Sequence, residues 1–162
     1  MKKVWGILAI ISVITLAFCA YFNLKTTSAT PQSPVKVVYT PEALVTILNR
    51  IRAENGSKPL KLDFRLNQSA QAKADQLAKD GWGANPHIDP SGKHGYEYAQ
   101  QLVKECNYPS ENLLANTTEV KRGFNWWLNS PDHKKAMLSD QWEITGFGVS
   151  GGYIVNHFCD VL

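Results

Sequence analysis

The sequence predicts an α+β domain in which the helices come first and a β-hairpin comes last. Between residues 40 and 138, apolar residues recur in several segments at helical spacing. The last twenty residues change to the alternation typical of strands, with two glycines between two such runs. No regular alternation of strands and helices and no glycine-rich phosphate loop is visible, so a layered α+β domain is expected.

The first two helices are predicted by their start and stop signals as well as by periodicity. Residues 40–42 read Thr-Pro-Glu, which favours a helix start because the hydroxyl can cap free backbone donors and proline fits the first turn. The apolar stripe that follows ends at Asn55. Asp63 can cap a second helix, which ends at Gly81 and whose alanine-rich face would let another layer approach closely.

The remaining elements alternate between helical and strand patterns, with a loop that carries two histidines after the second helix. The predicted elements are a helix over 96–104, a short strand over 110–114, a helix over 118–129, a helix over 131–138 capped by Ser130, and strands over 144–149 and 153–161. Serine, glycine and glycine at 150–152 join the two terminal strands as a hairpin.

The excess positive charge of the chain lies at its N-terminus. The sequence has 17 Lys and Arg against 14 Asp and Glu, and Lys2, Lys3 and Lys25 lie in the first 25 residues, where there is no acid. Without these three lysines, the remainder has 14 bases and 14 acids and is neutral. Nucleic-acid binding needs a clustered excess of basic residues, so we expect no nucleic-acid partner.

The first 34 residues predict a targeting segment and a linker. An uncharged run of 19 residues over 4–22 follows the lysine pair, and as a helix it would be about 28 Å long, enough to span a membrane. We therefore expect an N-terminal hydrophobic helix over 1–22 that acts as a signal anchor, with the rest of the chain extracytoplasmic. The alternative is a cleaved signal peptide and a secreted domain. Residues 23–34, rich in Thr, Ser and Pro, predict a linker to a domain over 35–162.

Two cysteines, Cys106 and Cys159, lie in the predicted domain. In an oxidising compartment such a pair is expected to form a disulfide. It would close a loop of about fifty residues and contribute about 3 to 4 kcal/mol to stability. The alternative is a pair of small, buried hydrophobic residues.

Histidines are the main candidates for chemistry in the domain. None of the four lies in an HExxH or CxxC arrangement, so spacing alone establishes no metal site. His87 on a loop, His133 in the first turn of a helix and Glu111 after a turn could converge as two imidazoles and a carboxylate, a set that suits zinc. Taken singly, each histidine could instead be a hydrogen-bonded structural residue. We interpret His157 as structural and His94 as solvent-exposed.

Five segments occur in an order that resembles one known family. They are LNRIRAENGSKPLKLDFRLNQSAQAKADQLA from residue 48, NPHIDPSG from residue 85, SENLL from residue 110, WWLNSPDHKKAML from residue 126 and ITGFGVSGGYIVNHF from residue 144. Together they resemble the CAP domain of cysteine-rich secretory proteins, antigen 5 and pathogenesis-related 1, in its bacterial extracellular SCP-like branch. The resemblance spans about residues 41–158, essentially the whole predicted domain.

The resemblance implies an α-β-α sandwich with a central antiparallel sheet and an open cleft where histidines and acids meet. By position, the cleft histidines are His87 and His133 and the acid is Glu111. The eukaryotic branch usually has a second glutamate in the stretch that corresponds to 127–130, which here offers Asn129 and Ser130 and no acid. Zinc held between the two histidines would therefore need water or another side chain as a further ligand.

The leading expectation is a binding module whose cleft receives a lipid, a glycan, a peptide or a cell-surface partner, with zinc as its candidate cofactor. An alternative of another class is a metal-dependent hydrolase or peptidase, in which Glu111 is the general base and His87 and His133 hold the metal. A triad of Ser130, His133 and Glu111 can also be drawn, but serine before proline at a helix start is more typical of a cap. A structural surface protein with a relict cleft is the third possibility.

Overall fold

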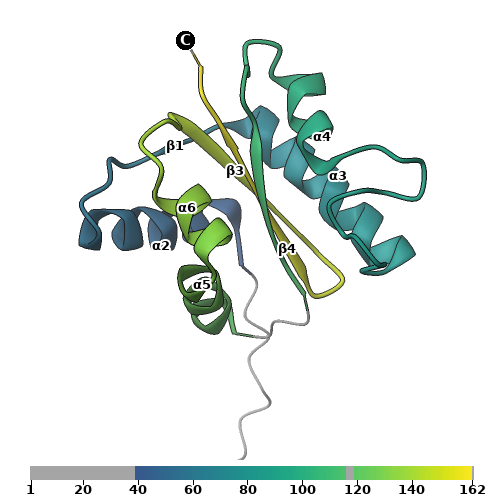
Figure 1. Ribbon diagram of the computed structural model, residues 1–162, viewed down its shortest axis with the longest axis horizontal. Helices are drawn as coiled ribbons and strands as arrows, with labels where there is room; N and C mark the ends of the chain where they lie inside the picture. Colours follow the sequence, from purple (N-terminus) through teal and green to yellow (C-terminus); the bar gives the residue numbers. More distant parts are fainter. Residues whose placement is uncertain (1–38, 116–118, 162) are drawn as a thin grey trace, which may run out of the picture. The chain divides into compact units, whose positions relative to one another are not determined.

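The computed structural model describes residues 39–115 and 119–161, which contain five helices and one four-stranded sheet (Figure 1). The predicted N-terminal helix over 1–22 and the linker over 23–34 lie outside the described residues. Of the helices that the structure describes, none combines the length and the apolar character needed to cross a membrane.

The described elements follow the predicted order. They are α2 (Pro41–Glu54), β1 (Lys61–Leu62), α3 (Phe64–Asp80), α4 (Gly95–Leu102), β2 (Ser110–Leu114), α5 (Val120–Asn129), α6 (Pro131–Leu138), β3 (Ile144–Ser150) and β4 (Tyr153–Cys159). The helical and strand patterns therefore correspond to real elements, and the α+β class is confirmed. Strand β1 was not predicted, because two residues are too few to show an alternation.

The side chains of two predicted capping residues, Thr40 and Asp63, cap their helices as expected, whereas the side chain of Ser130 does not cap α6. The Thr40 hydroxyl accepts the N–H of Ala43 at the start of α2, and the Asp63 carboxylate accepts two backbone N–H groups at the start of α3. Ser130 is the N-cap residue of α6, as predicted, but its side chain makes no capping hydrogen bond. Its hydroxyl lies 2.8 Å from Nδ1 of His133, and only its backbone carbonyl accepts a helical N–H of α6.

The sheet has the strand order β1-β3-β4-β2 and is mixed. Strands β3, β4 and β2 are antiparallel to one another, as expected, while β1 runs parallel to β3. The expectation of a wholly antiparallel sheet is therefore wrong at one edge. The segment that connects α2 to α3 contains β1 and runs alongside β3. In this segment, the N–H groups of Lys61 and Asp63 donate to the carbonyls of Glu143 and Thr145. The opposite edge strand, β2, carries Glu111 of the candidate site.

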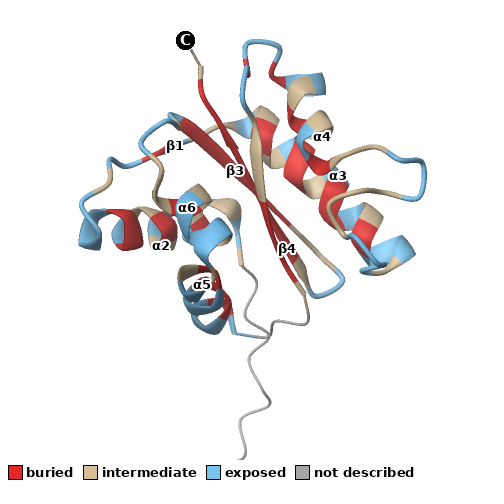
Figure 2. Ribbon diagram, viewed as in Figure 1, coloured by how far each residue is buried: buried red, intermediate tan, exposed pale blue. Residues whose placement is uncertain are grey.

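Helices cover both faces of the sheet, α2, α5 and α6 on one face and α3 and α4 on the other (Figure 1). Successive side chains of β4 alternate between the faces. Ile154 and Phe158 pack with α2 and α5, whereas Val155 packs with α3. The buried residues therefore follow the strands on both sides (Figure 2).

Helix α3 lies unusually close to β3 because the strand has glycines where they meet. A Cβ added to Gly146 or Gly148 would overlap the backbone of α3, at Leu66 and Ala70 respectively. The alanine-rich face of α3 completes this close approach, with Ala70 and Ala74 fully buried. This confirms the expected role of the alanines and packs the buried face of α3 against the sheet.

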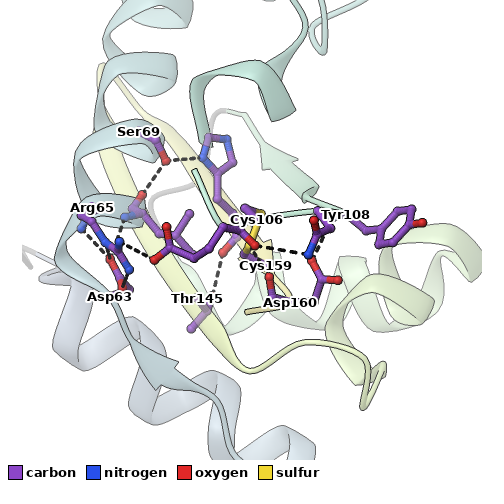
Figure 3. Close-up of a disulfide and its surroundings, with 12 residues drawn as sticks. Asp63, Arg65, Ser69, Cys106, Tyr108, Thr145, Cys159 and Asp160 are labelled. Atoms are coloured by element: carbon purple, nitrogen blue, oxygen red, sulfur yellow. Dashed lines mark hydrogen bonds and ion pairs between the residues drawn. A yellow bond between two sulfur atoms is a disulfide. The ribbon is translucent and has the colours of Figure 1, made fainter. Parts of the chain in front are cut away.

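The predicted disulfide between Cys106 and Cys159 is present (Figure 3). It joins the segment after α4 to the end of β4, with the two Cα atoms 5.6 Å apart and both residues buried. Next to it, the Asp160 carboxylate accepts the backbone N–H of Tyr108 at 2.8 Å. These links hold the segment that leads into β2 against β4.

Candidate functional site

The site is built around Glu111 on the edge strand β2. Alternation along this strand directs Glu111 and Leu113 toward the face covered by α3 and α4, because Leu113 packs with the alanines of α3. In the register of the sheet, Glu111 is paired with His157 of β4. Side chains of such a cross-strand pair point to the same face and can touch.

Two imidazoles hold the carboxylate of Glu111, one on each oxygen. His87 Nδ1 lies 2.7 Å from Oε1, and His157 Nε2 lies 3.0 Å from Oε2. Only 5% of the Glu111 side chain is exposed. Burial alone would raise the pKa of Glu111, but the hydrogen bonds from His157 and His87 outweigh it and keep the pKa below its ordinary value of 4.5. Glu111 is therefore an ionised, hydrogen-bond-accepting group at neutral pH.

The hydrogen-bonded series continues into the core behind His157. Ser69 on α3 places its Oγ 2.8 Å from His157 Nδ1 and 2.9 Å from the carbonyl oxygen of Leu66 (Figure 3). Ser69 and His157 are both buried, whereas 44% of the His87 side chain is exposed. Ser69, His157, Glu111 and His87 thus form a continuous series from the core to the surface.

A buried lysine adds positive charge beside this series. Lys73 lies one helical turn after Ser69 on α3, is fully buried, and donates to the side-chain oxygen of Gln76 at 2.8 Å. Burial lowers the pKa of Lys73, and the negative charges of Glu111 and Asp89 oppose that shift. The charge of Lys73 therefore compensates part of the charge of Glu111.

His133 is held at the start of α6 by a separate set of contacts. Its Nδ1 lies 2.8 Å from the Ser130 hydroxyl, and its backbone carbonyl accepts the Nδ2–H of Asn112 at 3.0 Å. The half-exposed ring of Trp126 lies 5.0 Å away, centre to centre. Burial, and then the positive charge of His87, lower the pKa of His133 from its ordinary value of 6.5. The imidazole of His133 is therefore largely neutral at pH 7.

The structure joins the predicted site residues as two pairs. His87 contacts Glu111 and His133 contacts Ser130, while no hydrogen bond between described residues joins one pair to the other. The electrostatic effect of His87 on His133 is the link between them. A triad of Ser130, His133 and Glu111 is therefore not formed, because the carboxylate of Glu111 lies with two other histidines.

His87 and His133 are both partly buried, and both use Nδ1 for their contacts with neighbouring side chains. No described residue forms a hydrogen bond with Nε2 of His87 or Nε2 of His133. In the described ranges, the group of three potential ligand side chains with donor atoms within 4.8 Å of one another is Cys106, Cys159 and Asp160, and it contains the disulfide. A metal at the histidines would therefore have two protein ligands and would complete its coordination with water or a bound ligand.

Sequence reasoning missed three buried polar residues of this site. His157 was expected to be structural, and it is buried, but it also contacts Glu111 directly. Ser69 and Lys73 share the buried face of α3, and polar residues within an alanine-rich stripe are a signal that could have identified them. His94 is half-buried rather than solvent-exposed, because its ring stacks on Tyr96.

The fold and the site together define an α+β domain with helices on both faces of a small sheet and a histidine–glutamate site at the sheet edge. Residues 45–159 match the family model of CAP, the cysteine-rich secretory protein family, and the chain belongs to this family. The resemblance noted in the sequence is thereby confirmed.

Several bacterial proteins are similar to this chain. The uncharacterized protein YkwD of Bacillus subtilis is 24% identical over 122 residues, which are 75% of this chain and 47% of that protein. An extracellular SCP-domain protein of Bacillus anthracis has a TM-score of 0.67 and 20% identity, covering 82% of this chain and 45% of that one. An outer surface protein of Borrelia burgdorferi has a TM-score of 0.66 and 21% identity, covering 75% of this chain and 92% of that one. The chain thus spans about half the length of its curated relative, and the solved structures support the fold.

Proposed function

We propose that the chain is an extracytoplasmic CAP-domain binding module whose His87 and His133 hold a divalent metal such as zinc. The metal and the surface around it would receive a small ligand, a lipid, a glycan or a peptide, or a partner at the cell surface. The observation that carries the proposal is the shared arrangement of the two imidazoles. Each has its Nδ1 engaged by a neighbouring side chain, at 2.7 Å and 2.8 Å, and its Nε2 without a described protein partner.

This donor set fits zinc. Neutral imidazole nitrogen is a preferred zinc ligand, and histidine ligands commonly have their other ring nitrogen bonded to a carboxylate or another polar group. Glu111 supplies that group for His87, and Ser130 supplies it for His133. The lowered pKa of His133 also favours the neutral form that binds metal.

When bound, the metal would supply a Lewis acid for an oxygen atom of the ligand. The chain itself contributes orientation and contact area. Glu111 and Ser130 fix the directions of the two imidazoles, and the ring of Trp126, 54% exposed beside His133, offers an apolar surface to a ligand.

Extracytoplasmic placement is supported by the N-terminal lysine pair and apolar run, by the disulfide, and by the described locations of two similar proteins. One of those proteins is extracellular and the other is an outer surface protein. We propose that the N-terminal segment anchors this chain to the membrane, or that the domain is secreted where the segment is cleaved.

The alternative of a metal-dependent hydrolase receives less support from the geometry. A general base needs a carboxylate oxygen within reach of the water that it deprotonates. Both oxygens of Glu111 already accept hydrogen bonds from imidazoles, and the side chain is nearly buried. A binding role therefore agrees better with the way in which Glu111 is held.

Zinc titration calorimetry on the full-length chain in a mild detergent tests the metal site. We expect one zinc ion per wild-type chain, and loss of that site in His87→Ala and in His133→Ala, because each removes one of two protein ligands. His94→Gln is the matched control, because His94 belongs to neither pair, and it should bind as the wild type does. Identical isotherms for wild type and His87→Ala would rule out the proposed pair.

Turnover separates binding from hydrolysis. The zinc-loaded chain is expected to leave peptide and ester libraries uncleaved, as followed by mass spectrometry. Cleavage that disappears in His133→Ala would replace the binding proposal with the hydrolase.

A further inference from the structure

We propose that His157 and Ser69 are positioning residues of the site, which hold Glu111 in the orientation that fixes the tautomer of His87. The expected effect on zinc affinity rests on the proposed metal site, whereas the hydrogen-bond geometry and the tautomer of His87 do not depend on a metal. His157 lies between Ser69 and Glu111, with its Nδ1 2.8 Å from Ser69 Oγ and its Nε2 3.0 Å from Glu111 Oε2.

Proton positions in this series follow from the chemistry of its groups. An ionised carboxylate can only accept hydrogen bonds, so the nitrogens that face Glu111 must carry protons. These are Nε2 of His157 and Nδ1 of His87. A neutral His87 then has its lone pair on Nε2, the atom proposed to bind the metal. Glu111 thereby selects the metal-binding tautomer of His87.

Ser69 supports this arrangement from the core side. Its hydroxyl has one proton and two neighbours, the Leu66 carbonyl oxygen at 2.9 Å and His157 Nδ1 at 2.8 Å. When the proton is donated to His157, the histidine is neutral with Nε2 protonated. When it is donated to Leu66, the hydroxyl accepts a hydrogen bond from Nδ1–H, and His157 is then the doubly protonated imidazolium, whose positive charge faces Glu111. In both cases His157 Nε2 remains a donor to Glu111.

Because Glu111 is buried, its Oε2 atom depends on His157 for a hydrogen-bond donor. His157 is 0% exposed, and a Cβ added to Gly95 would overlap the Glu111 carboxylate, so the space around it is filled. Water therefore cannot readily replace a missing donor at Oε2. Without His157, the carboxylate would have an unsatisfied oxygen in a site of low dielectric constant and would be expected to rotate away from His87.

Four variants of the full-length chain separate positioning from a structural role. His157→Leu removes the donor to Glu111, His157→Gln retains an N–H donor, and Ser69→Ala removes the support behind the histidine. Thr145→Val is the matched control, because Thr145 is buried and its hydroxyl donates to the backbone carbonyl of His157, not to its ring.

The first readout needs no metal. Two-bond ¹H–¹⁵N spectra of labelled imidazoles report which ring nitrogen of His87 carries the proton. Wild type and Thr145→Val should show the single Nδ1–H tautomer, His157→Leu a mixture of tautomers, and Ser69→Ala a smaller change in the same direction. His157→Gln should restore most of the wild-type pattern.

The second readout is zinc affinity by calorimetry. Loss of an outer-shell partner typically weakens metal binding about 10- to 100-fold, and we expect a loss of that size for His157→Leu and none for Thr145→Val. A folded His157→Leu with an unchanged His87 tautomer and unchanged affinity would overturn the inference. If His157→Leu does not fold, an unchanged tautomer in Ser69→Ala overturns it instead. If the wild type binds no zinc, the metal site fails while the tautomer result still decides the role of His157.

Discussion

Glu111 connects two histidines of opposite exposure, because each of its oxygens accepts a hydrogen bond from a different imidazole. His157 is buried and His87 reaches the surface. A carboxylate held at both oxygens has a single orientation, so a small displacement of Glu111 should directly change its hydrogen bond to His87. The residue packed against that carboxylate is Gly95, the first residue of α4.

Replacement of Gly95 by alanine tests this dependence without removing a polar group. The new Cβ would overlap the carboxylate of Glu111, which cannot move without breaking a hydrogen bond to a histidine. We expect Gly95→Ala to weaken zinc binding about tenfold and also to lower the melting temperature, because a buried carboxylate loses a hydrogen bond; calorimetry and thermal unfolding measure the two effects.

Gly123→Ala on α5 is the matched control. Its added Cβ would overlap the side chain of Leu114 in the core, on the other face of the sheet. It should reduce stability and leave zinc affinity unchanged. Equal effects of the two substitutions on zinc affinity would contradict the proposed role of the contact between Gly95 and Glu111.

Helix α3 positions two buried site residues, so its start and its packing matter to the site. Asp63 caps the helix through the N–H groups of Arg65 and Leu66 and also accepts hydrogen bonds from the Arg65 side chain. The hydrogen bond from the Arg65 side chain is the largest cause of the lowered pKa of Asp63, whose ordinary value is 3.8. The ionised cap therefore stabilises the folded state above that pH.

A pH series on Asp63→Ala is expected to show this contribution. At pH 7 the substitution should lower the free energy of unfolding by about 1 kcal/mol, the usual value of such a cap. Because the folded-state pKa is depressed, the contribution is present above pH 3.8 and is lost as pH falls through the lower folded value. Urea unfolding between about pH 2 and pH 7 measures the difference.

Asp63→Asn serves as the control for charge, since it keeps an oxygen that can cap the helix. Its deficit at neutral pH should be smaller than that of the alanine variant. A deficit of Asp63→Ala that is the same at both ends of the pH series would contradict the assigned role of the ionised carboxylate.

At the scale of the whole molecule, the disulfide closes a long covalent loop within the domain. Cys106 and Cys159 are 53 positions apart. A cross-link of that span restricts the unfolded chain and is expected to stabilise the protein by about 4 kcal/mol. The Cys106→Ser, Cys159→Ser double variant should show this loss in chemical denaturation.

The reduced wild type should resemble the double variant, because both lack the cross-link. Mass spectrometry of the unreduced protein checks that the bond is present. Equal unfolding free energies for oxidised wild type and double variant would show that the cross-link contributes little to stability.

Much of the architecture was predictable because it depends on local signals. The starts of α2 and α3 follow from Thr40 and Asp63, and the terminal hairpin follows from strand alternation around a glycine pair. Strand β1 was missed, since two residues show no period. The side chain of Ser130 was expected to cap α6, but a serine three residues before a histidine can bond either to a backbone N–H of the helix or to the imidazole, and here it bonds to His133.

The buried contacts of the site could not be predicted from the sequence to the same extent. Ser69 and His157 are 88 positions apart, and their contact arises from the packing of α3 against β4. The motif order indicated that His87 and Glu111 belong to one cleft, but only the strand register shows that His157 lies on the second oxygen of Glu111. Tertiary packing thus determines how the glutamate is held.

Zinc binding between His87 and His133 is tested most directly by a crystal structure of the zinc-loaded full-length chain, with anomalous scattering recorded at the zinc edge. We expect one anomalous peak at coordination distance, about 2.0 to 2.1 Å, from Nε2 of both His87 and His133. Glu111 should remain on Nδ1 of His87 and outside the coordination sphere. A zinc ion bound elsewhere, or bound directly by Glu111, would contradict the proposed site.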